Sequence, residues 1–292
     1  MPYDFYMPDT VCDALQILDS HQGPLKVLAG GTDLILALRQ KKIQPKGIVD
    51  LSGVSQLKQV KVEGNRISIG SLVTFSQIAS IKGLGQRASL LVEAALDIGS
   101  PQIRNQGTIG GNIANASPAA DIVPPLLVLE AVAVIESCRG SREVPVAELL
   151  AGAGCTNLTD DEIITEIRFD LPAPEAKSTF RKFGRRNALA IARISTAMLV
   201  IVENNVVKEA KLALGAVAPN PFRAPELEAM LRGQALSTEL LEEVIQASGL
   251  LVGEKLGKRP SAIWKKEAIK GLMRETMVNL HLMQGVNRDG YN

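Results

Sequence analysis

The stretch Thr108 to Pro124, TIGGNIANASPAADIVP, consists almost entirely of small residues, and it has an upstream counterpart in Val27 to Leu34, VLAGGTDL. Both stretches have an aliphatic or β-branched lead-in, a Gly-Gly pair and then a small polar residue. Glycine permits backbone angles that other residues resist, and it lacks the Cβ that would hold a ligand away from the main chain. Two separated loops of this kind predict that something large is held between them.

An anionic ligand suits such loops, because backbone N–H groups in glycine-rich turns near helix N-termini form concavities that bind anions. Each charge-assisted hydrogen bond contributes about 1.5–3 kcal/mol and a helix dipole only about 0.3–1 kcal/mol, so several bonds would be needed to hold a pyrophosphate. Neither the GxGxxG fingerprint of Rossmann domains nor the GxxxxGK[ST] P-loop occurs here. The alternative is that the glycines only form tight turns.

The segments around the first loop predict a compact βαβ unit, with strands at 25–29 and 47–51 and a helix from Asp33. Alternating apolar and polar residues predict two hairpins, one around Gly64-Asn65 and one around Gly140. Further apolar patterns predict helices at 74–80, 86–99 and from 123, and a strand at 161–171.

The best domain boundary is PAPEAKS at 172–178, with two prolines and a charge cluster. Beyond it, three antiparallel strands are predicted, the last two turning at Asn204-Asn205. The strands are expected at 178–184, 192–203 and 206–217, and helices at 224–233, 237–256 and from about Ser261 to Leu282.

The composition excludes several classes of function. Lys and Arg total 32 against 31 Asp and Glu, so the chain of 292 residues has no long-range field for nucleic acid or an anionic membrane. No apolar segment approaches the roughly 18 residues of a membrane helix, and no secretory signal is visible. Cys12, Cys138 and Cys155 are odd in number and widely spaced, so we expect no disulfide framework or metal site and a reducing cytoplasm.

Only two histidines occur, His21 in a Gly/Pro loop and His281 on a predicted C-terminal helix. Neither sits in a setting typical of a Ser-His-Asp triad. Any chemistry is therefore expected to be carried by a cofactor rather than by side chains.

Three segments together resemble the FAD-binding subunit of molybdenum hydroxylases: LAGGTDL at 28–34, GSPQIRNQGTIGGNIANASPAADIVPPLLVLEA at 99–131 and DEIITEI at 161–167. That family includes bacterial xanthine dehydrogenase, nicotinate dehydrogenase and carbon monoxide dehydrogenase, and the resemblance covers essentially the whole chain. It implies an α+β fold in which a small βαβ subdomain (1–55) and a larger α+β subdomain (56–173) clasp FAD. A C-terminal domain (174–292) with a three-stranded antiparallel sheet and a helical bundle would follow.

The resemblance also implies which residues bind the cofactor. The main chain of Val27 to Leu34 would wrap the pyrophosphate, and the Thr108–Asn112 segment would form a second wall. Asp121 would contact the ribityl and flavin side, a strand edge at 162–164 would lie beside the cofactor, and Lys182 would contact FAD. The expected cofactor-binding residues are Val27, Leu28, Ala29, Gly30, Gly31, Thr32, Asp33, Leu34, Gly99, Thr108, Ile109, Gly110, Gly111, Asn112, Asp121, Glu162, Ile163, Ile164 and Lys182. No catalytic or metal-ligating residue is expected.

The function implied is electron transfer within a multi-subunit molybdenum hydroxylase. Electrons would pass from [2Fe-2S] clusters of a partner subunit to non-covalently bound FAD and leave to NAD+ or another acceptor. Molybdopterin and the iron–sulfur clusters would sit only on partner subunits, and the complex would hydroxylate a purine or other N-heterocycle. Two alternatives stay open: a stand-alone FAD oxidoreductase of the same fold, and a non-catalytic nucleotide-binding module.

Overall fold

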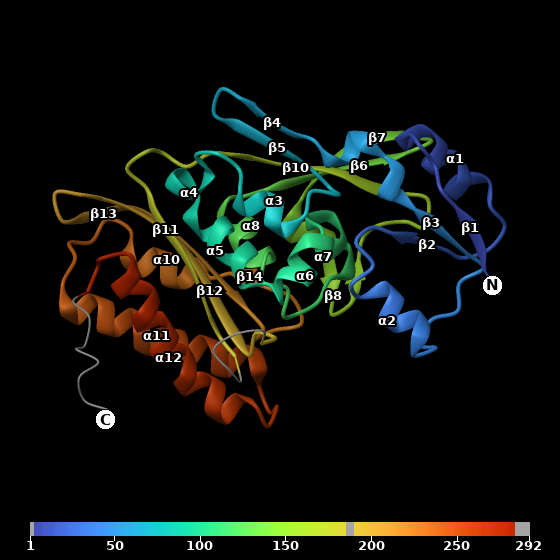
Figure 1. The fold of residues 1–292 in the computed structure, drawn as a ribbon. Coiled ribbons are helices and arrows are strands. Elements are labelled where there is room, and N and C mark those ends of the chain that lie inside the picture. Colours follow the sequence, from blue (N-terminus) through green and yellow to red (C-terminus); the bar gives the residue numbers. More distant parts are fainter. Residues whose placement is uncertain (1–2, 185–189, 284–292) are drawn as a thin grey trace.

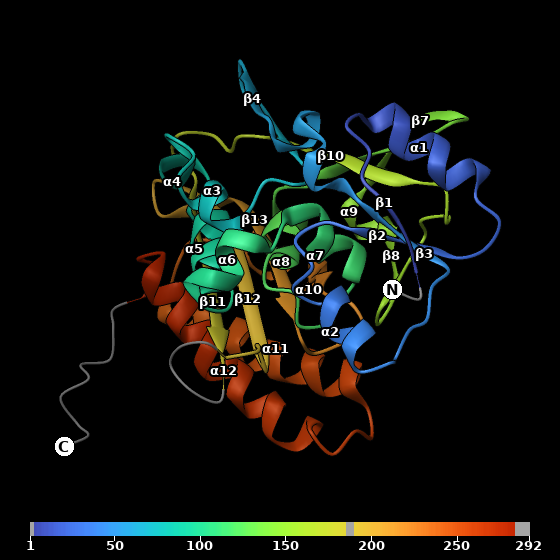
Figure 2. The ribbon, with the colours of Figure 1, turned by 45° about the vertical axis from the view of Figure 1, so that its right-hand side comes forward.

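The computed structural model describes residues 3–184 and 190–283 of the chain. A small parallel sheet occupies one end of the molecule, an antiparallel sheet with its helices lies in the middle, and a second antiparallel sheet backed by long helices forms the other end (Figures 1 and 2). The predicted α+β class is therefore confirmed.

The N-terminal part contains the predicted βαβ unit together with elements that the sequence patterns did not predict. The sheet is parallel with the order β1-β3-β2, and the unpredicted elements include its edge strand β1 and helix α1. Three residues are too few for a recognisable alternation, so β1 escapes prediction. The elements are β1 (Asp4–Tyr6), α1 (Val11–Ser20), β2 (Leu25–Leu28), α2 (Leu34–Arg39), β3 (Gly47–Asp50), η1 (Leu51–Gly53) and η2 (Ser55–Lys58).

The middle sheet has five antiparallel strands in the order β4-β5-β10-β6-β7. The two predicted hairpins form β4–β5 and β6–β7, and β10 lies between them. Residues 162–164, expected to form a strand edge beside the cofactor, lie at the start of β10, which is the central strand of this sheet. The strands are β4 (Val60–Glu63), β5 (Arg66–Gly70), β6 (Val132–Ser137), β7 (Gly140–Pro145) and β10 (Ile163–Asp170).

The residues between β5 and β6 form a layer of short helices, as Figure 1 shows. The second glycine stretch is expected to be a loop, and this expectation is wrong because α7 begins directly after Thr108. The elements are α3 (Phe75–Ala79), α4 (Leu84–Arg87), α5 (Ser89–Asp97), α6 (Pro101–Gln106), α7 (Ile109–Asn115) and α8 (Val123–Val128), with α9 (Val146–Leu149), β8 (Leu150–Gly152) and β9 (Cys155–Thr156) after β7.

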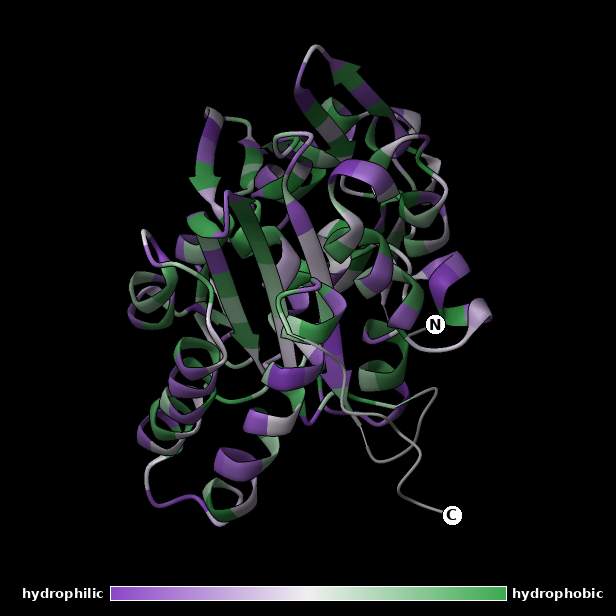
Figure 3. Ribbon diagram, turned by 90° about the vertical axis from the view of Figure 1, so that its left-hand side faces the viewer, coloured by the Kyte–Doolittle hydropathy of each residue, from purple (hydrophilic) through white to green (hydrophobic). Residues whose placement is uncertain are grey.

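The C-terminal sheet has four strands rather than the three expected, because a two-residue strand, β14, pairs with β13. The helices that cover it alternate between hydrophobic and hydrophilic residues along their length (Figure 3). The third helix also ends earlier than predicted, so His281 lies beyond it. The elements are β11 (Lys177–Phe183), β12 (Ile194–Glu203), β13 (Val206–Gly215), β14 (Phe222–Arg223), α10 (Pro225–Leu231), α11 (Thr238–Leu256) and α12 (Ala262–Asn279).

Among the residues that the structure describes, the hydrophobic core consists of three clusters, and the central one joins the two halves of the chain. Phe180 of β11 is fully buried in the central cluster, among residues of α5 and the middle sheet. Glu93 of α5 accepts hydrogen bonds from the Thr179 hydroxyl at 2.8 Å and from the Phe180 N–H at 2.7 Å. The first half of β11 is therefore held against the helical layer, which positions the next residues of the strand.

Candidate functional site

The first glycine stretch forms the connection between β2 and α2. Gly31 has φ +71°, a left-handed conformation that favours glycine, and its carbonyl accepts the N–H of Ile35 at 3.2 Å. The side chain of Asp33 stands at the helix N-cap but makes no capping hydrogen bond. Of the residues from Val27 to Leu34, only Asp33 is exposed, while the others are half-buried. The backbone here is therefore partly accessible and turns sharply.

The second glycine stretch is the first turn of α7, and its leading N–H groups have protein acceptors. The Ile109 N–H donates to the Val73 carbonyl at 3.1 Å, and the Gly110 N–H donates to the Ser71 carbonyl at 2.9 Å. The Gly111 N–H donates to the hydroxyl of Thr108, the N-cap, at 3.2 Å. The expectation of exposed N–H donors in this stretch is therefore wrong, because these three donors already have acceptors within the protein.

The two stretches lie close to one another, and the nearest neighbour of Gly30 is the residue pair just before the second stretch. A Cβ on Gly30 would lie 1.8 Å from the Gln106 carbonyl oxygen, and a Cβ on Gly111 would lie 3.5 Å from the Ala29 Cβ. A Cβ on Gly110 would lie 2.5 Å from the Cβ of Ser71. The absence of large side chains is expected to leave the space that a ligand needs. At Gly30 and Gly110 the close approach of the protein's own atoms, the Gln106 carbonyl and Ser71, is enough to require glycine.

Asp121 and Lys182 form a buried ion pair. Lys182 Nζ donates to Asp121 Oδ2 at 2.8 Å and to the Asp97 carbonyl at 2.5 Å, and the two charged side chains are only 8–9% exposed. Burial raises the pKa of Asp121 from 3.8 to about 6, against the lowering effect of Lys182. Desolvation therefore outweighs the attraction of the partner.

Glu162 forms its hydrogen bonds with Arg142 and Thr159 rather than with the Asp121–Lys182 pair. Arg142 donates to both of its carboxylate oxygens, at 2.7 and 2.8 Å, and the Thr159 N–H donates at 2.9 Å. These hydrogen bonds, with that of Arg142 first, lower the pKa of Glu162. Ile163 is buried in the cluster on which Val27 and Ala29 pack, and Ile164 is buried in the central cluster. The start of β10 thus lies beneath the first glycine stretch.

Gly99 and the backbone carbonyls of Asp97 and Gln106 also belong to the candidate site. Gly99 has φ +47°, and its carbonyl accepts a hydrogen bond from Arg104 at 3.0 Å. Sequence reasoning missed Asp97, which holds Lys182 through its carbonyl, and Gln106, which faces Gly30. Backbone carbonyls leave no signal in a sequence, since every residue has one.

Two buried acceptor atoms test whether the residues fit FAD. Asn112 Oδ1 and Asp121 Oδ1 are buried and have no hydrogen-bond partner among the described residues. An unsatisfied buried polar group costs about 1–3 kcal/mol. Donors such as the ribityl hydroxyl groups of FAD would satisfy both atoms, and the half-buried backbone turn at Gly31 offers further polar contacts. The residues present therefore fit a ligand of this kind.

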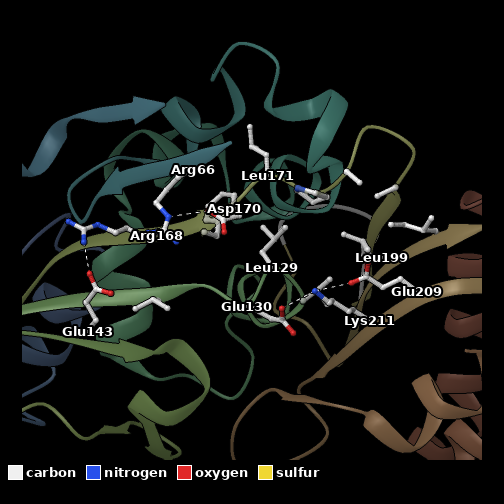
Figure 4. Close-up of a pocket in the computed structure, with 17 residues that line it drawn as sticks. Arg66, Leu129, Glu130, Glu143, Arg168, Asp170, Leu171, Leu199, Glu209 and Lys211 are labelled. Atoms are coloured by element: carbon white, nitrogen blue, oxygen red, sulfur yellow. Dashed lines mark hydrogen bonds and ion pairs between the residues drawn. The ribbon is translucent and has the colours of Figure 1, made fainter. Parts of the chain in front are cut away.

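A separate cavity of about 360 Å³ contains none of the predicted residues (Figure 4). Each charged residue that lines it is in an ion pair with another lining residue. The pairs are Arg66–Asp170, Arg168–Glu143, Lys211–Glu130 and Lys211–Glu209. Because the charged side chains of this cavity are paired with one another, we assign the cavity no binding role.

Across residues 3–184 and 190–283, no helix combines the length and the apolar character that a membrane span requires. The same ranges contain no group of three or more His, Cys, Asp or Glu residues placed to hold a metal ion.

Comparison with known proteins gives matches over nearly the whole chain. Residues 1–173 match the family described as FAD binding domain in molybdopterin dehydrogenase, and residues 178–277 match the CO dehydrogenase flavoprotein C-terminal domain. The chain is 34% identical to the nicotinate dehydrogenase FAD-subunit of Eubacterium barkeri, over 95% of this chain and 96% of the relative. It is 32% identical to the xanthine dehydrogenase FAD-binding subunit of Escherichia coli O157:H7, over 83% and 84%.

A solved structure is also similar. It is carbon monoxide dehydrogenase from Hydrogenophaga pseudoflava lacking the Mo-pyranopterin moiety, with a TM-score of 0.90 and 27% sequence identity. The match covers 96% of this chain and 98% of the solved chain.

Proposed function

We propose the function of this chain from one premise: the chain belongs to the family of FAD-binding subunits of molybdopterin dehydrogenases. The resemblance expected from the sequence and the oxidoreductase class are thereby confirmed. Within that family, this chain is the electron-transfer subunit of a molybdenum hydroxylase. It accepts electrons from [2Fe-2S] clusters of a partner subunit and passes them to NAD+ or another acceptor, while molybdopterin is held on a further subunit.

FAD binds without a covalent bond along the two glycine stretches and reaches the Asp121–Lys182 pair. The single observation that carries this assignment is that two acceptor atoms, Asn112 Oδ1 and Asp121 Oδ1, are buried and have no hydrogen-bond partner among the described residues. They are the acceptors of the proposed site, and Val27 to Leu34 supply its half-buried backbone. The proposed division into residues 1–173, with subdomains 1–55 and 56–173, and residues 174–292 puts Lys182 on the C-terminal domain, where it closes the site.

When bound, FAD supplies the reversible uptake of one or two electrons. The chain's own residues bind and orient it. Lys182 holds a positive charge in a buried position, and a cation in such a place stabilises negative charge next to it. Asp121 accepts hydrogen bonds, and its pKa of about 6 means that it also exchanges a proton near neutral pH. No residue of the chain is assigned an acid, base or nucleophile role in substrate chemistry.

The complex acts on a purine or other N-heterocycle, and we place it in the cytoplasm. The names of the relatives support this class of substrate, since they include dehydrogenases of nicotinate and xanthine. Cys12, Cys138 and Cys155 are free and exposed, which fits a reducing compartment.

The test is to purify the chain alone and with its partner subunits. The chain alone should be yellow and release FAD on denaturation, and it should reduce a dye with NADH if NAD+ is the acceptor. Hydroxylation of a purine or pyridine should appear only when partner subunits are added. Substrate turnover by the single chain would favour a stand-alone FAD oxidoreductase, and the absence of any reducible flavin would favour a nucleotide-binding module without catalysis.

A further inference from the structure

Helix α5 runs beside strand β11, which is the edge strand of the C-terminal sheet. The two elements lie side by side in both views of the fold (Figures 1 and 2). An edge strand exposes backbone N–H and C=O groups that have no neighbouring strand to bind them. On this edge, residues of α5 take the place of a neighbouring strand, so they help to determine where β11 lies.

Three residues of α5 contact β11: Ser89, Glu93 and Asp97. The Ser89 hydroxyl donates to the Ser178 carbonyl and lies 2.9 Å from the Ser178 hydroxyl. At the other end of the helix, the Asp97 carbonyl accepts from Lys182 Nζ at 2.5 Å. Residues four apart lie on one face of a helix, so the contacts form a single row. The row covers about 12 Å of helix and about 13 Å of strand, so the two elements match in length.

Glu93 lies in the middle of this row and binds three successive residues of β11. Glu93 Oε2 accepts from the Thr179 hydroxyl at 2.8 Å and from the Phe180 N–H at 2.7 Å. The Arg181 guanidinium donates to the same oxygen at 3.5 Å. Thr179 and Phe180 are buried, and buried donors are found almost always with an acceptor. Glu93 therefore fixes the position of β11 along α5.

The register of β11 decides whether Lys182 reaches Asp121. Lys182 follows Arg181 directly, and its ammonium group lies 2.8 Å from Asp121 Oδ2. Moving a strand by one residue turns each of its side chains to the opposite face of the sheet. Such a shift would take the Lys182 ammonium group away from Asp121, and the hydrogen bonds of Glu93 oppose it.

We propose, building on the proposed function, that Glu93 is a positioning residue of the flavin site: it holds β11 in the register that places Lys182 Nζ against Asp121. Among the described residues, its hydrogen-bond donors all lie at 179–181, so it acts on Lys182 only through the strand. A cation beside the flavin favours the reduced form, which carries more negative charge. Through Lys182, Glu93 therefore raises the reduction potential of FAD, although its own negative charge acts in the opposite direction.

The experiment measures the midpoint potential of FAD bound to the full chain in two variants that separate position from charge. Glu93→Asp keeps the charge but withdraws the carboxylate from the strand, whereas Glu93→Gln removes the charge but keeps an oxygen that accepts hydrogen bonds. Glu93→Asp should lower the potential by about 30 mV, equivalent to a tenfold loss of affinity for reduced relative to oxidised FAD. Glu93→Gln should keep the wild-type potential. A direct effect of the charge predicts the reverse: a raised potential in Glu93→Gln and no change in Glu93→Asp.

Lys182→Met tests whether Glu93 acts through Lys182. This substitution should lower the potential at least as much as Glu93→Asp, and adding Glu93→Asp to it should cause no further change. Glu228→Asp is the matched control, because the buried Glu228 carboxylate also accepts from a strand N–H, that of Leu212 at 2.8 Å. The control should lower the midpoint of urea unfolding and leave the potential unchanged. If Glu93→Asp does not fold, Thr179→Val removes one hydrogen bond to Glu93 and should also lower the potential.

Four outcomes would overturn the proposal. They are a wild-type potential in both Glu93→Asp and Thr179→Val, a raised potential in Glu93→Gln, a further drop when Glu93→Asp is added to Lys182→Met, and an equal drop in Glu228→Asp. The proposed function fails in a different way, through the absence of bound FAD from the wild-type chain. Bound FAD whose potential does not respond to Lys182→Met would remove Lys182 from the flavin site, and the positioning role of Glu93 with it.

Discussion

Lys182 Nζ lies 2.8 Å from Asp121 Oδ2 although the two residues are 61 positions apart in the chain, and both side chains are buried. Lys182 comes from β11 of the C-terminal sheet, whereas Asp121 precedes α8 of the helical layer. The pair therefore ties the C-terminal sheet to the proposed flavin site, and its properties can be tested separately from activity.

Lys182→Met should destabilise the flavin-free protein strongly at pH 8. Removing one partner leaves the Asp121 carboxylate buried and unpaired, which typically costs about 3–5 kcal/mol. The measurement is the free energy of unfolding in urea. Lys177→Met, on the same strand but at an exposed position, should cost less than about 0.5 kcal/mol. Equal effects of the two substitutions would mean that the ion pair has no role in stability.

Asp121 should make the stability of the flavin-free protein fall as the pH rises. Its pKa is about 6 in the folded chain against an ordinary value of 3.8, so the folded state binds the proton more tightly than the unfolded state. The stability that this proton contributes is fully present below about pH 4 and is lost as the pH rises through 6. At about 1.4 kcal/mol per pKa unit, the change is about 2–3 kcal/mol.

The Asp121→Asn variant isolates that contribution from those of other groups. The free energy of unfolding of the wild type, minus that of the variant, should decrease between pH 4 and pH 7. Urea unfolding at four pH values measures the difference. A constant difference, or one that increases with pH, contradicts the raised pKa.

Gly30→Ala should destabilise the protein by about 1–3 kcal/mol or more, the range for overpacked sites. The new Cβ would lie 1.8 Å from a backbone carbonyl oxygen, and backbone cannot move aside as a flexible side chain can. Gly271→Ala is the control, because a Cβ there meets no atom within 4 Å and lies on α12. The control should be stabilised by about 0.5–1 kcal/mol, as alanine is favoured over glycine in helices. Thermal unfolding of both variants decides the point.

Gly111→Val should lower the FAD content of the purified chain far more than its stability. A Cβ at Gly111 would lie 2.9 Å from the Thr108 hydroxyl, a side-chain atom, so the fold can adapt at the cost of a helix cap, typically about 1 kcal/mol. The branched side chain would nevertheless narrow the space between the two glycine stretches. Flavin absorbance per chain and circular dichroism are the measurements, with Gly85→Val as the control at an open position. Normal FAD content in Gly111→Val would remove this residue from the site.

Local sequence patterns are sufficient to predict those helices and strands in which apolar residues recur at a regular spacing. The βαβ unit, both hairpins and the long strands β12 and β13 were predicted because their apolar residues recur at intervals that only one kind of element satisfies. Strands β1 and β14 have three and two residues, so no period could reveal them. The Gly-Gly pair of α7 predicts a loop because glycine disfavours a helix, but the Thr108 cap and the hydrogen bonds to Ser71 and Val73 override that preference.

For the candidate site, the sequence by itself determined the family, the identity of the glycines and the presence of Asp121 and Lys182. Only the tertiary structure decided what these residues do to each other. It placed Lys182 against Asp121, used the N–H groups at the start of α7 for protein contacts, and put the Gln106 carbonyl next to Gly30. The physical reason is that burial, the pKa and steric fit depend on atoms from distant parts of the chain, whereas a sequence pattern records only neighbours.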